Sequence, residues 1–155
     1  MTGSLNRYQQ AHEQDFKARY PQAYYSGHYF LPKMPDCKKA NGLTRAIVNY
    51  LLFLGYRATR INSTGRIIKA PERQASGISL QTAKFIPGTT RKGTADISAT
   101  IKGRSVMIEV KVGKDRPSEY QLREQQLEQR AGGQYWFIHN FDEFIEYYDN
   151  FIITL

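Results

Sequence analysis

The order of elements that this sequence predicts is that of an α/β protein, in which helices flank a β-sheet. Three observations carry this prediction. Apolar residues recur at helical spacing over residues 41–55, two β-branched segments flank a turn at Lys102-Gly103, and an almost continuous apolar run at residues 134–139 follows a predicted helix. A chain of 155 residues suits a single domain with an adequate core.

Residues 1–40 are expected to form an extension that precedes the main domain, residues 41–155. Residues 4–19 are compatible with a helix, but their apolar spacing is weak, so this helix needs to dock in order to be stable. Residues 20–35 are rich in tyrosine and proline. Their aromatic rings either stack on exposed nucleobases or pack over the domain or across a dimer interface, and we favour packing.

Residues 41–55 show the most regular helical pattern of the chain. Asn41 is a suitable N-cap, and Gly55 is placed for the left-handed residue that often follows a helix. The apolar face of this helix is expected to cover the sheet.

The next segment predicts a β-hairpin followed by a long loop. The alternating residues 56–61 indicate a strand, which a turn at residues 62–65 would pair with residues 66–69. Pro and Gly interrupt any period in residues 70–92, apart from a short strand at residues 78–85. A loop of this length is often functional.

A second hairpin is predicted over residues 97–112, where two β-branched segments flank the turn at Lys102-Gly103. A loop of two or four residues places Asp96 opposite Glu109 on one side of the sheet. The other side then carries the apolar residues Ala95, Ile97, Ala99, Val106, Ile108 and Val110. This clean alternation supports the register.

Two carboxylates that face each other are destabilising unless something offsets their repulsion. A divalent cation would do so, because Mg²⁺ prefers oxygen ligands and is often held by one or two carboxylates. Lys111 lies on the same side and could orient or deprotonate an attacking water. The other interpretation is an exposed sheet face with a Glu109–Lys111 pair and an unrelated Asp96, but the register and the apolar reverse face favour a metal site.

The last third of the chain predicts a helix, a strand and a helix. The first helix follows a basic turn at residues 113–117, and Ser118 with Gln121 matches a capping box. Gln121 therefore has a structural explanation that we weigh equally against a role at the metal site, and both hold only if its side chain is shared. A buried strand at residues 134–139 is followed by a helix whose end, residues 151–155, is expected to dock.

The composition is ordinary for a soluble globular protein, apart from its charge. Lys and Arg number 22 against 14 Asp and Glu, which gives a net charge of +8. A basic surface supplies the salt-sensitive part of nucleic-acid binding, so a polyanionic partner is the first inference. The charge alone is equally compatible with a protein that binds no specific polyanion.

The single cysteine, Cys37, excludes an intrachain disulfide and a zinc site built from the cysteines of this chain. Met1 is followed by polar residues, and the longest apolar run, residues 51–54, is too short to span a bilayer. A cytoplasmic location is therefore expected.

Three segments resemble the motifs of the PD-(D/E)xK nuclease superfamily. They are Gly93-Thr94-Ala95-Asp96, Ile108-Glu109-Val110-Lys111 and Ser118-Glu119-Tyr120-Gln121. The resemblance is greatest to the VRR-NUC branch, whose small stand-alone phage and bacterial members are similar to Holliday junction resolvases. Ala95 stands where this superfamily usually has proline, and Asn41, Gly42 and Thr44 stand where it commonly has a glutamate in the first core helix.

The resemblance covers roughly residues 41–145 and implies a restriction-endonuclease-like αβββαβ core, with a mixed central sheet flanked by helices. It also implies a DNA endonuclease dependent on Mg²⁺ or Mn²⁺. Asp96, Glu109 and the Val110 carbonyl would hold the metal, Lys111 would position the water, and Gln121 would assist. A branched DNA substrate, such as a Holliday junction, and a homodimer follow from the resemblance alone.

Polar and basic loop residues are the expected contacts to nucleic acid. They are Asn62, Ser63, Lys84, Arg91, Lys92, Lys114 and Arg116. Two alternatives to a DNA endonuclease stay open. One is a nucleic-acid-binding module that keeps the fold without cutting, which the missing helix glutamate favours. The other is a ribonuclease or phage-defence nuclease with the same metal site.

Overall fold

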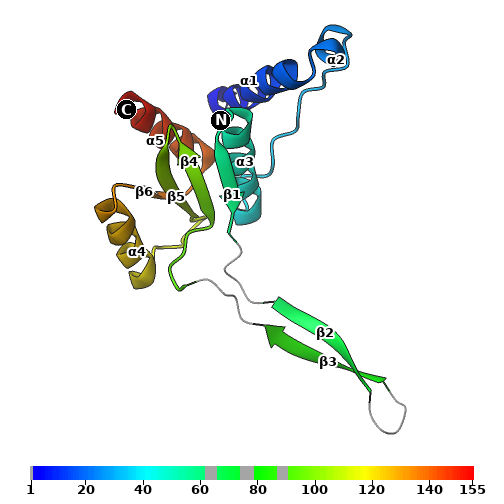
Figure 1. The fold of residues 1–155 in the computed structure, drawn as a ribbon, viewed down its shortest axis with the longest axis vertical. Helices are drawn as coiled ribbons and strands as arrows, with labels where there is room; N and C mark the ends of the chain where they lie inside the picture. Colours follow the sequence, from blue (N-terminus) through cyan, green and yellow to red (C-terminus); the bar gives the residue numbers. More distant parts are fainter. Residues whose placement is uncertain (1, 62–65, 74–78, 87–90) are drawn as a thin grey trace.

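A four-stranded mixed sheet forms the centre of the computed structural model, which describes residues 2–61, 66–73, 79–86 and 91–155 (Figure 1). The strand order is β1-β4-β5-β6, in which β1 pairs antiparallel with β4, β4 antiparallel with β5, and β5 parallel with β6. These strands are β1 (Arg57–Arg60), β4 (Ile97–Ile101), β5 (Arg104–Val110) and β6 (Gln134–Ile138). The predicted α/β class, with a mixed sheet flanked by helices, is confirmed.

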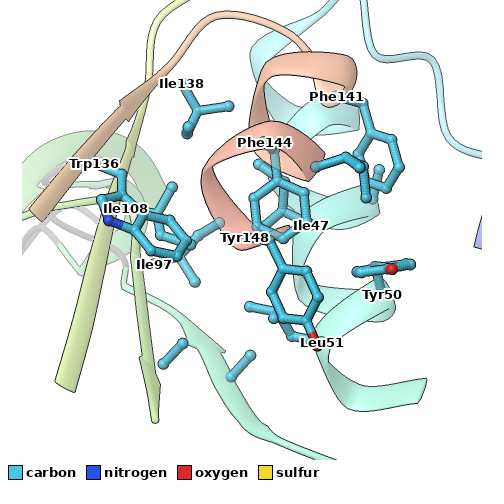
Figure 2. Close-up of a cluster of buried hydrophobic side chains, with 14 of the residues drawn as sticks. Ile47, Tyr50, Leu51, Ile97, Ile108, Trp136, Ile138, Phe141, Phe144 and Tyr148 are labelled. Carbon is cyan, nitrogen blue, oxygen red and sulfur yellow. The ribbon is translucent and has the colours of Figure 1, made fainter. Parts of the chain in front are cut away.

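The helices divide between the two faces of the sheet. On one face lie α3 (Ala40–Phe53) and α5 (Phe141–Ile153), whose apolar stripes pack over Ile97 and Ile108 (Figure 2). The other face, to which the alternate residues of β5 point, is covered by α4 (Glu119–Arg130). All six apolar residues predicted for the reverse side of the second hairpin are buried. The core therefore lies between the sheet and the pair α3 and α5.

The β4–β5 hairpin has the predicted register, because Ile97 is paired with Ile108 and Ile101 with Arg104. Lys102 and Gly103, the two loop residues, both have positive φ angles of 50° and 81°. Two successive positive φ values are typical of the type I′ turn, whose twist matches that of the flanking strands. The turn chemistry and the apolar alternation thus specify the same register.

The predicted pairing of residues 56–61 with residues 66–69 is wrong. β1 pairs with β4, while β2 (Arg66–Arg73) pairs with β3 (Ser79–Ile86) in a separate two-stranded sheet that projects from the body (Figure 1). The pairing with β4 places β1 beside the buried part of the sheet, where Ala58 is buried. Burial in the sheet therefore outweighs the local turn signal.

The interpretation of residues 70–92 as a loop is also wrong, because β2 and β3 occupy much of this range. The short strand predicted at residues 78–85 is confirmed by β3, whereas the predicted turn at residues 62–65 lies outside the described residues. β2 and β3 pair over their full eight residues, including Pro71. In a two-stranded sheet both strands are edge strands, and an edge strand tolerates proline.

Asn41 is not the N-cap of α3. The helix begins at Ala40, and the carbonyl of Lys39 accepts hydrogen bonds from the backbone N–H groups of Gly42 and Leu43. The Asn41 side chain instead accepts a hydrogen bond of 2.7 Å from the Arg60 guanidinium. Gly55, with a φ of +78°, has the left-handed conformation that the sequence predicted.

The predicted helix at residues 4–19 corresponds to α1 (Thr2–Arg19), and it docks on the domain. Tyr8 is buried and makes edge-to-face contacts with Phe53 and Phe141, so α1 contributes to the same core as α3 and α5. At its inner end Arg7 forms an ion pair with Asp149 of α5. Apolar packing and this ion pair together supply the docking that α1 requires.

The aromatic residues that follow α1 divide into two groups. Around α2 (Pro21–Tyr25), Tyr24 and Tyr29 pack on each other, and Tyr29 also contacts rings of α1, whereas Tyr25 and Phe30 are 74% and 81% exposed. At the C-terminus, Phe151 is buried and Ile152 packs against the core, but Ile153 and Leu155 are exposed. The predicted docking of residues 151–155 is therefore wrong for residues 153–155. Within the described ranges, we find no helix with the length and hydropathy needed to cross a membrane.

Candidate active site

The first two acidic residues of the site lie at the same end of adjacent strands. Asp96 directly precedes β4, and Glu109 is the penultimate residue of β5. A carboxylate oxygen of Asp96 accepts a hydrogen bond of 3.1 Å from the Val110 N–H, and its backbone carbonyl accepts one of 2.7 Å from the Ile61 N–H. These two bonds fix Asp96 between β1 and β5, next to Glu109.

Glu109 is the most unusual residue of the site, because its carboxylate is buried. The residue is only 6% exposed, and its Oε1 atom accepts a hydrogen bond from Gln121 and forms an ion pair with Lys111. Its Oε2 atom is buried without a hydrogen-bond partner among the described residues. An unpartnered buried carboxylate oxygen is costly, so a group that satisfies Oε2 is expected there.

The protonation of Glu109 is correspondingly shifted. Burial and the nearby negative charge of Asp96 raise the pKa of Glu109 to about 7, although Lys111 acts in the opposite direction. A positive charge placed beside Glu109 would favour the ionised carboxylate.

Lys111 supplies the only ammonium group that contacts Glu109 within the described part of the chain. It follows β5 directly and is only 5% exposed. Its Nζ atom lies 3.2 Å from Glu109 Oε1 and 3.3 Å from Asp115 Oδ2. Our reading of the sequence missed Asp115, because we interpreted residues 113–117 only as a basic turn.

A polar face of α4 covers these residues. No residue of α4, which is described over its whole length, is fully buried. The helix instead meets the sheet and its loops through four polar side chains at helical spacing. Gln121 donates to Glu109, Glu124 pairs with Arg91, Gln125 donates to the Tyr135 carbonyl, and Glu128 accepts from Ser105. Hydrogen bonds and an ion pair thus dominate the attachment of this layer.

The Gln121 side chain is shared between a helix cap and a contact with Glu109. Its Oε1 atom accepts a hydrogen bond of 2.8 Å from the Ser118 N–H, and Ser118 Oγ accepts from the Gln121 N–H, so the capping box is formed. The Nε2 atom of the same side chain donates to Glu109. The cap therefore fixes the amide that holds Glu109.

The loop that leads to Asp96 is packed against the first turn of α4. Gly93 has a φ of +86°, and a Cβ atom at this position would lie 2.5 Å from the Tyr120 carbonyl oxygen. The Tyr135 hydroxyl donates a hydrogen bond of 3.1 Å to the Gly93 carbonyl, and burial, followed by the charges of Glu109 and Asp96, raises the pKa of this tyrosine. Tyr135, which we predicted only as part of a buried strand, thus anchors the loop.

The predicted nucleic-acid contacts have different outcomes. Arg91 and Lys92 are exposed beside α4, where Arg91 pairs with Glu124 and Lys92 lies over the Tyr120 ring. Lys114 and Arg116 are exposed in the loop between Lys111 and α4. Lys84 belongs to β3, but its side chain is not described, and Asn62 and Ser63 lie outside the described residues. Four of the seven residues therefore lie on segments that adjoin the site.

The acidic residues at the ends of β4 and β5 suit a divalent cation better than the residues of α3 do. Asp96 and Glu109 are adjacent, and the unpartnered Oε2 atom of Glu109 is available as a ligand. Among the described residues, however, no group of three or more His, Cys, Asp and Glu is arranged to hold a metal. The helix α3, which is described over its whole length, contains no Asp or Glu, and its Asn41 binds Arg60, so it provides no third acid in the place where the family resemblance would expect one.

Comparisons with known proteins give no match: none of the protein-family models matches this chain, and none of the curated proteins does. Functional inference therefore depends on the geometry of Asp96, Glu109 and Lys111.

Proposed function

We propose that this chain is a metal-dependent DNA endonuclease of the PD-(D/E)xK type, with a VRR-NUC-like domain over residues 41–155. The observation that carries the proposal is the buried Glu109 carboxylate, whose Oε2 atom has no hydrogen-bond partner among the described residues while Asp96 and Lys111 lie beside it. A purely structural ion pair would not require a second carboxylate next to an unsatisfied one. Mg²⁺, or Mn²⁺ in its place, is the cation that we propose.

The element order supports a restriction-endonuclease-like core. Within the described residues α3, β1, β4, β5, α4 and β6 follow one another, interrupted only by the β2–β3 hairpin between β1 and β4. This is the αβββαβ order with one inserted hairpin. Asp96 directly precedes the second strand of that order, and Glu109 lies on the third.

Each residue of the site has a proposed role. Asp96, Glu109 and the Val110 carbonyl would hold the metal ion, which when bound supplies charge stabilisation and a more acidic water. The Val110 N–H keeps the Asp96 carboxylate oriented, and Gln121 does the same for Glu109. Lys111 is placed to donate a hydrogen bond to a water or to a phosphate oxygen. Its ammonium group has three N–H donors and contacts two carboxylates among the described residues.

Two further parts of the proposal come from the family resemblance. They are a branched DNA substrate such as a Holliday junction and a homodimer that presents two sites to two strands. A cytoplasmic location, which the sequence itself suggested, is also part of the proposal. The net charge of +8 and the exposed Arg91, Lys92, Lys114 and Arg116 are compatible with a DNA backbone as the ligand.

A second candidate function is a DNA-binding module that does not cut. The observation that favours it is the absence of an acid from α3 at the site, since Asn41 is engaged with Arg60. The buried Glu109 counts against it, because a pure binder gains nothing from a desolvated carboxylate near a phosphate backbone.

The test is cleavage of labelled linear duplex, single-stranded, flap and four-way-junction DNA in the presence of Mg²⁺, Mn²⁺ or EDTA. Cleavage in either metal and none in EDTA is the expected result, and the ranking of substrates identifies the preferred structure. Tight binding without cleavage under all conditions would support the binding module. Absence of both binding and cleavage would overturn both functions.

Gln121→Ala should separate the cap from the site when it is compared with Ser118→Ala. Both changes break the capping box and should lower the free energy of unfolding by about 1 kcal/mol. Only Gln121→Ala removes the donor to Glu109, so it alone should slow cleavage, by about tenfold. Urea unfolding and single-turnover cleavage rates measure the two effects. Equal cleavage rates in the two variants would show that Gln121 acts only as a cap.

A further inference from the structure

The ammonium group of Lys111 lies between two carboxylates of different character. Glu109, at 3.2 Å, is buried, whereas the side chain of Asp115, at 3.3 Å, is 56% exposed. Lys111 itself is almost completely buried. Asp115 therefore forms the solvent side of a short chain of charges that ends at Glu109.

Glu109 and Asp115 differ in what they bind besides Lys111. Glu109 already accepts a hydrogen bond from Gln121, and under the proposed function it is also a metal ligand. A cation bound to Glu109 would repel the Lys111 ammonium at short range. Among the described residues, the Asp115 side chain forms a hydrogen bond only with Lys111. It can therefore stay bound to Nζ when a cation occupies Glu109.

The backbone explains how Asp115 returns to Lys111. Gly113 has a φ of +65°, and the Asp115 N–H donates a hydrogen bond of 3.3 Å to the Val112 carbonyl. This turn reverses the chain directly after β5. It places the side chain of residue 115 over that of residue 111, before Ser118 begins the capping box of α4.

We propose that Asp115 is a positioning residue for the nuclease reaction: it holds the Lys111 ammonium at the site when a metal ion occupies Glu109. The inference rests on the proposed function. A lysine ammonium has three N–H donors. One is donated to Asp115, and the ammonium also pairs with Glu109 at 3.2 Å, which leaves a donor for the attacking water or the phosphate. Without Asp115, Lys111 keeps its charge but loses its fixed position.

The test compares Asp115→Ala, Asp115→Asn and wild type in single-turnover cleavage over a range of Mg²⁺ concentrations. The matched control is Glu146→Gln, which removes one exposed acidic charge from α5. Asp115→Ala should lower the rate at saturating Mg²⁺ by about 10- to 100-fold, because misplacement of a catalytic group by an ångström has effects of this size. Its half-saturating Mg²⁺ concentration should stay within about twofold of wild type, since Asp115 contacts Lys111 and not the proposed metal ligands.

Asp115→Asn keeps an oxygen that can accept from Nζ, so it should recover a large part of the rate lost in Asp115→Ala. A rise in the half-saturating Mg²⁺ concentration would instead make Asp115 a metal ligand and overturn the inference. A normal rate with a lower Tm would assign Asp115 a structural role, which would also overturn it.

A measurement without cleavage separates this inference from the proposed function. In protein labelled with ¹⁵N-lysine and free of metal, the Nζ protons of Lys111, assigned with Lys111→Met, should exchange slowly with water because two carboxylates hold them. Faster exchange in Asp115→Ala, with no change in Glu146→Gln, would support the contact even if wild type cuts no DNA. An unchanged exchange rate in Asp115→Ala would refute it.

Discussion

Replacement of Asp96 by asparagine should reduce DNA cleavage by roughly 1000-fold while the protein stays folded. A metal ion contributes several kcal/mol of charge stabilisation to the transition state, and loss of about 4 kcal/mol corresponds to this factor. Asparagine keeps an oxygen that can accept the hydrogen bond from the Val110 N–H, so the local backbone should be retained. The change therefore removes charge without removing the structural contact.

Single-turnover rates in Mg²⁺, thermal unfolding and DNA binding in EDTA measure the consequences of Asp96→Asn. Binding should be unchanged or tighter, because one negative charge near the phosphates is lost. Asp36→Asn, which removes an exposed acid of the segment before α3, is the control and should cut normally. An Asp96→Asn protein that cuts at the wild-type rate would contradict the assignment of the site.

Gly93→Ala should lower the free energy of unfolding by about 2–5 kcal/mol. Two effects add at this position. A φ of +86° is unfavourable for alanine, and the new Cβ atom would lie 2.5 Å from the Tyr120 carbonyl oxygen, which is backbone and cannot rotate away. Relief of this clash requires α4 to move from the loop that carries Asp96, so cleavage should fall as well.

Gly103→Ala is the matched control for the backbone conformation alone. Gly103 has a φ of +81°, but apart from its two chain neighbours no described residue has a heavy atom within 4 Å of the position that its Cβ would occupy. Gly103→Ala should lower the free energy of unfolding only by the cost of the backbone conformation, about 1–2 kcal/mol, and leave cleavage unchanged. Urea unfolding of the two variants measures the difference. Equal losses of stability would mean that the contact between Gly93 and α4 is not important in solution.

The β4–β5 hairpin could be predicted in detail because its signals are local. Lys102-Gly103 supplies the turn, and the alternation from Ala95 to Val110 leaves one register that buries the apolar side. The position of Asp96 beside Glu109 follows from that register. Where turn chemistry and side-chain period agree, a short segment determines its own structure.

The pairing of β1 could not be predicted in the same way. Its partner, β4, lies more than thirty residues further along the chain, and the intervening β2 and β3 pair with each other. The sequence around Arg57–Arg60 contains nothing that distinguishes a near partner from a distant one. The choice depends on which arrangement buries Ala58 in the sheet, and burial is a property of the assembled fold.

Asp115 and the polar face of α4 were missed for a different reason. An apolar period reveals only the helix faces that pack through apolar side chains, whereas α4 faces the sheet with Gln121, Glu124, Gln125 and Glu128. These polar positions do have helical spacing, so the same search applied to polar residues would have found this face. The contact of Asp115 with Lys111 depends on the conformation of the turn at Gly113, which residue types alone do not specify.

The attachment of α4 also bears on how this protein can evolve. The apolar core lies on the opposite side of the sheet, between the strands and α1, α3 and α5, and none of its buried residues comes from α4. Substitutions on α4 can therefore change the surroundings of Glu109 and the adjoining surface without disturbing the residues that keep the chain folded. In this architecture, α4 is the layer that can adapt to a new ligand, and the layer on the other side of the sheet keeps this small domain folded.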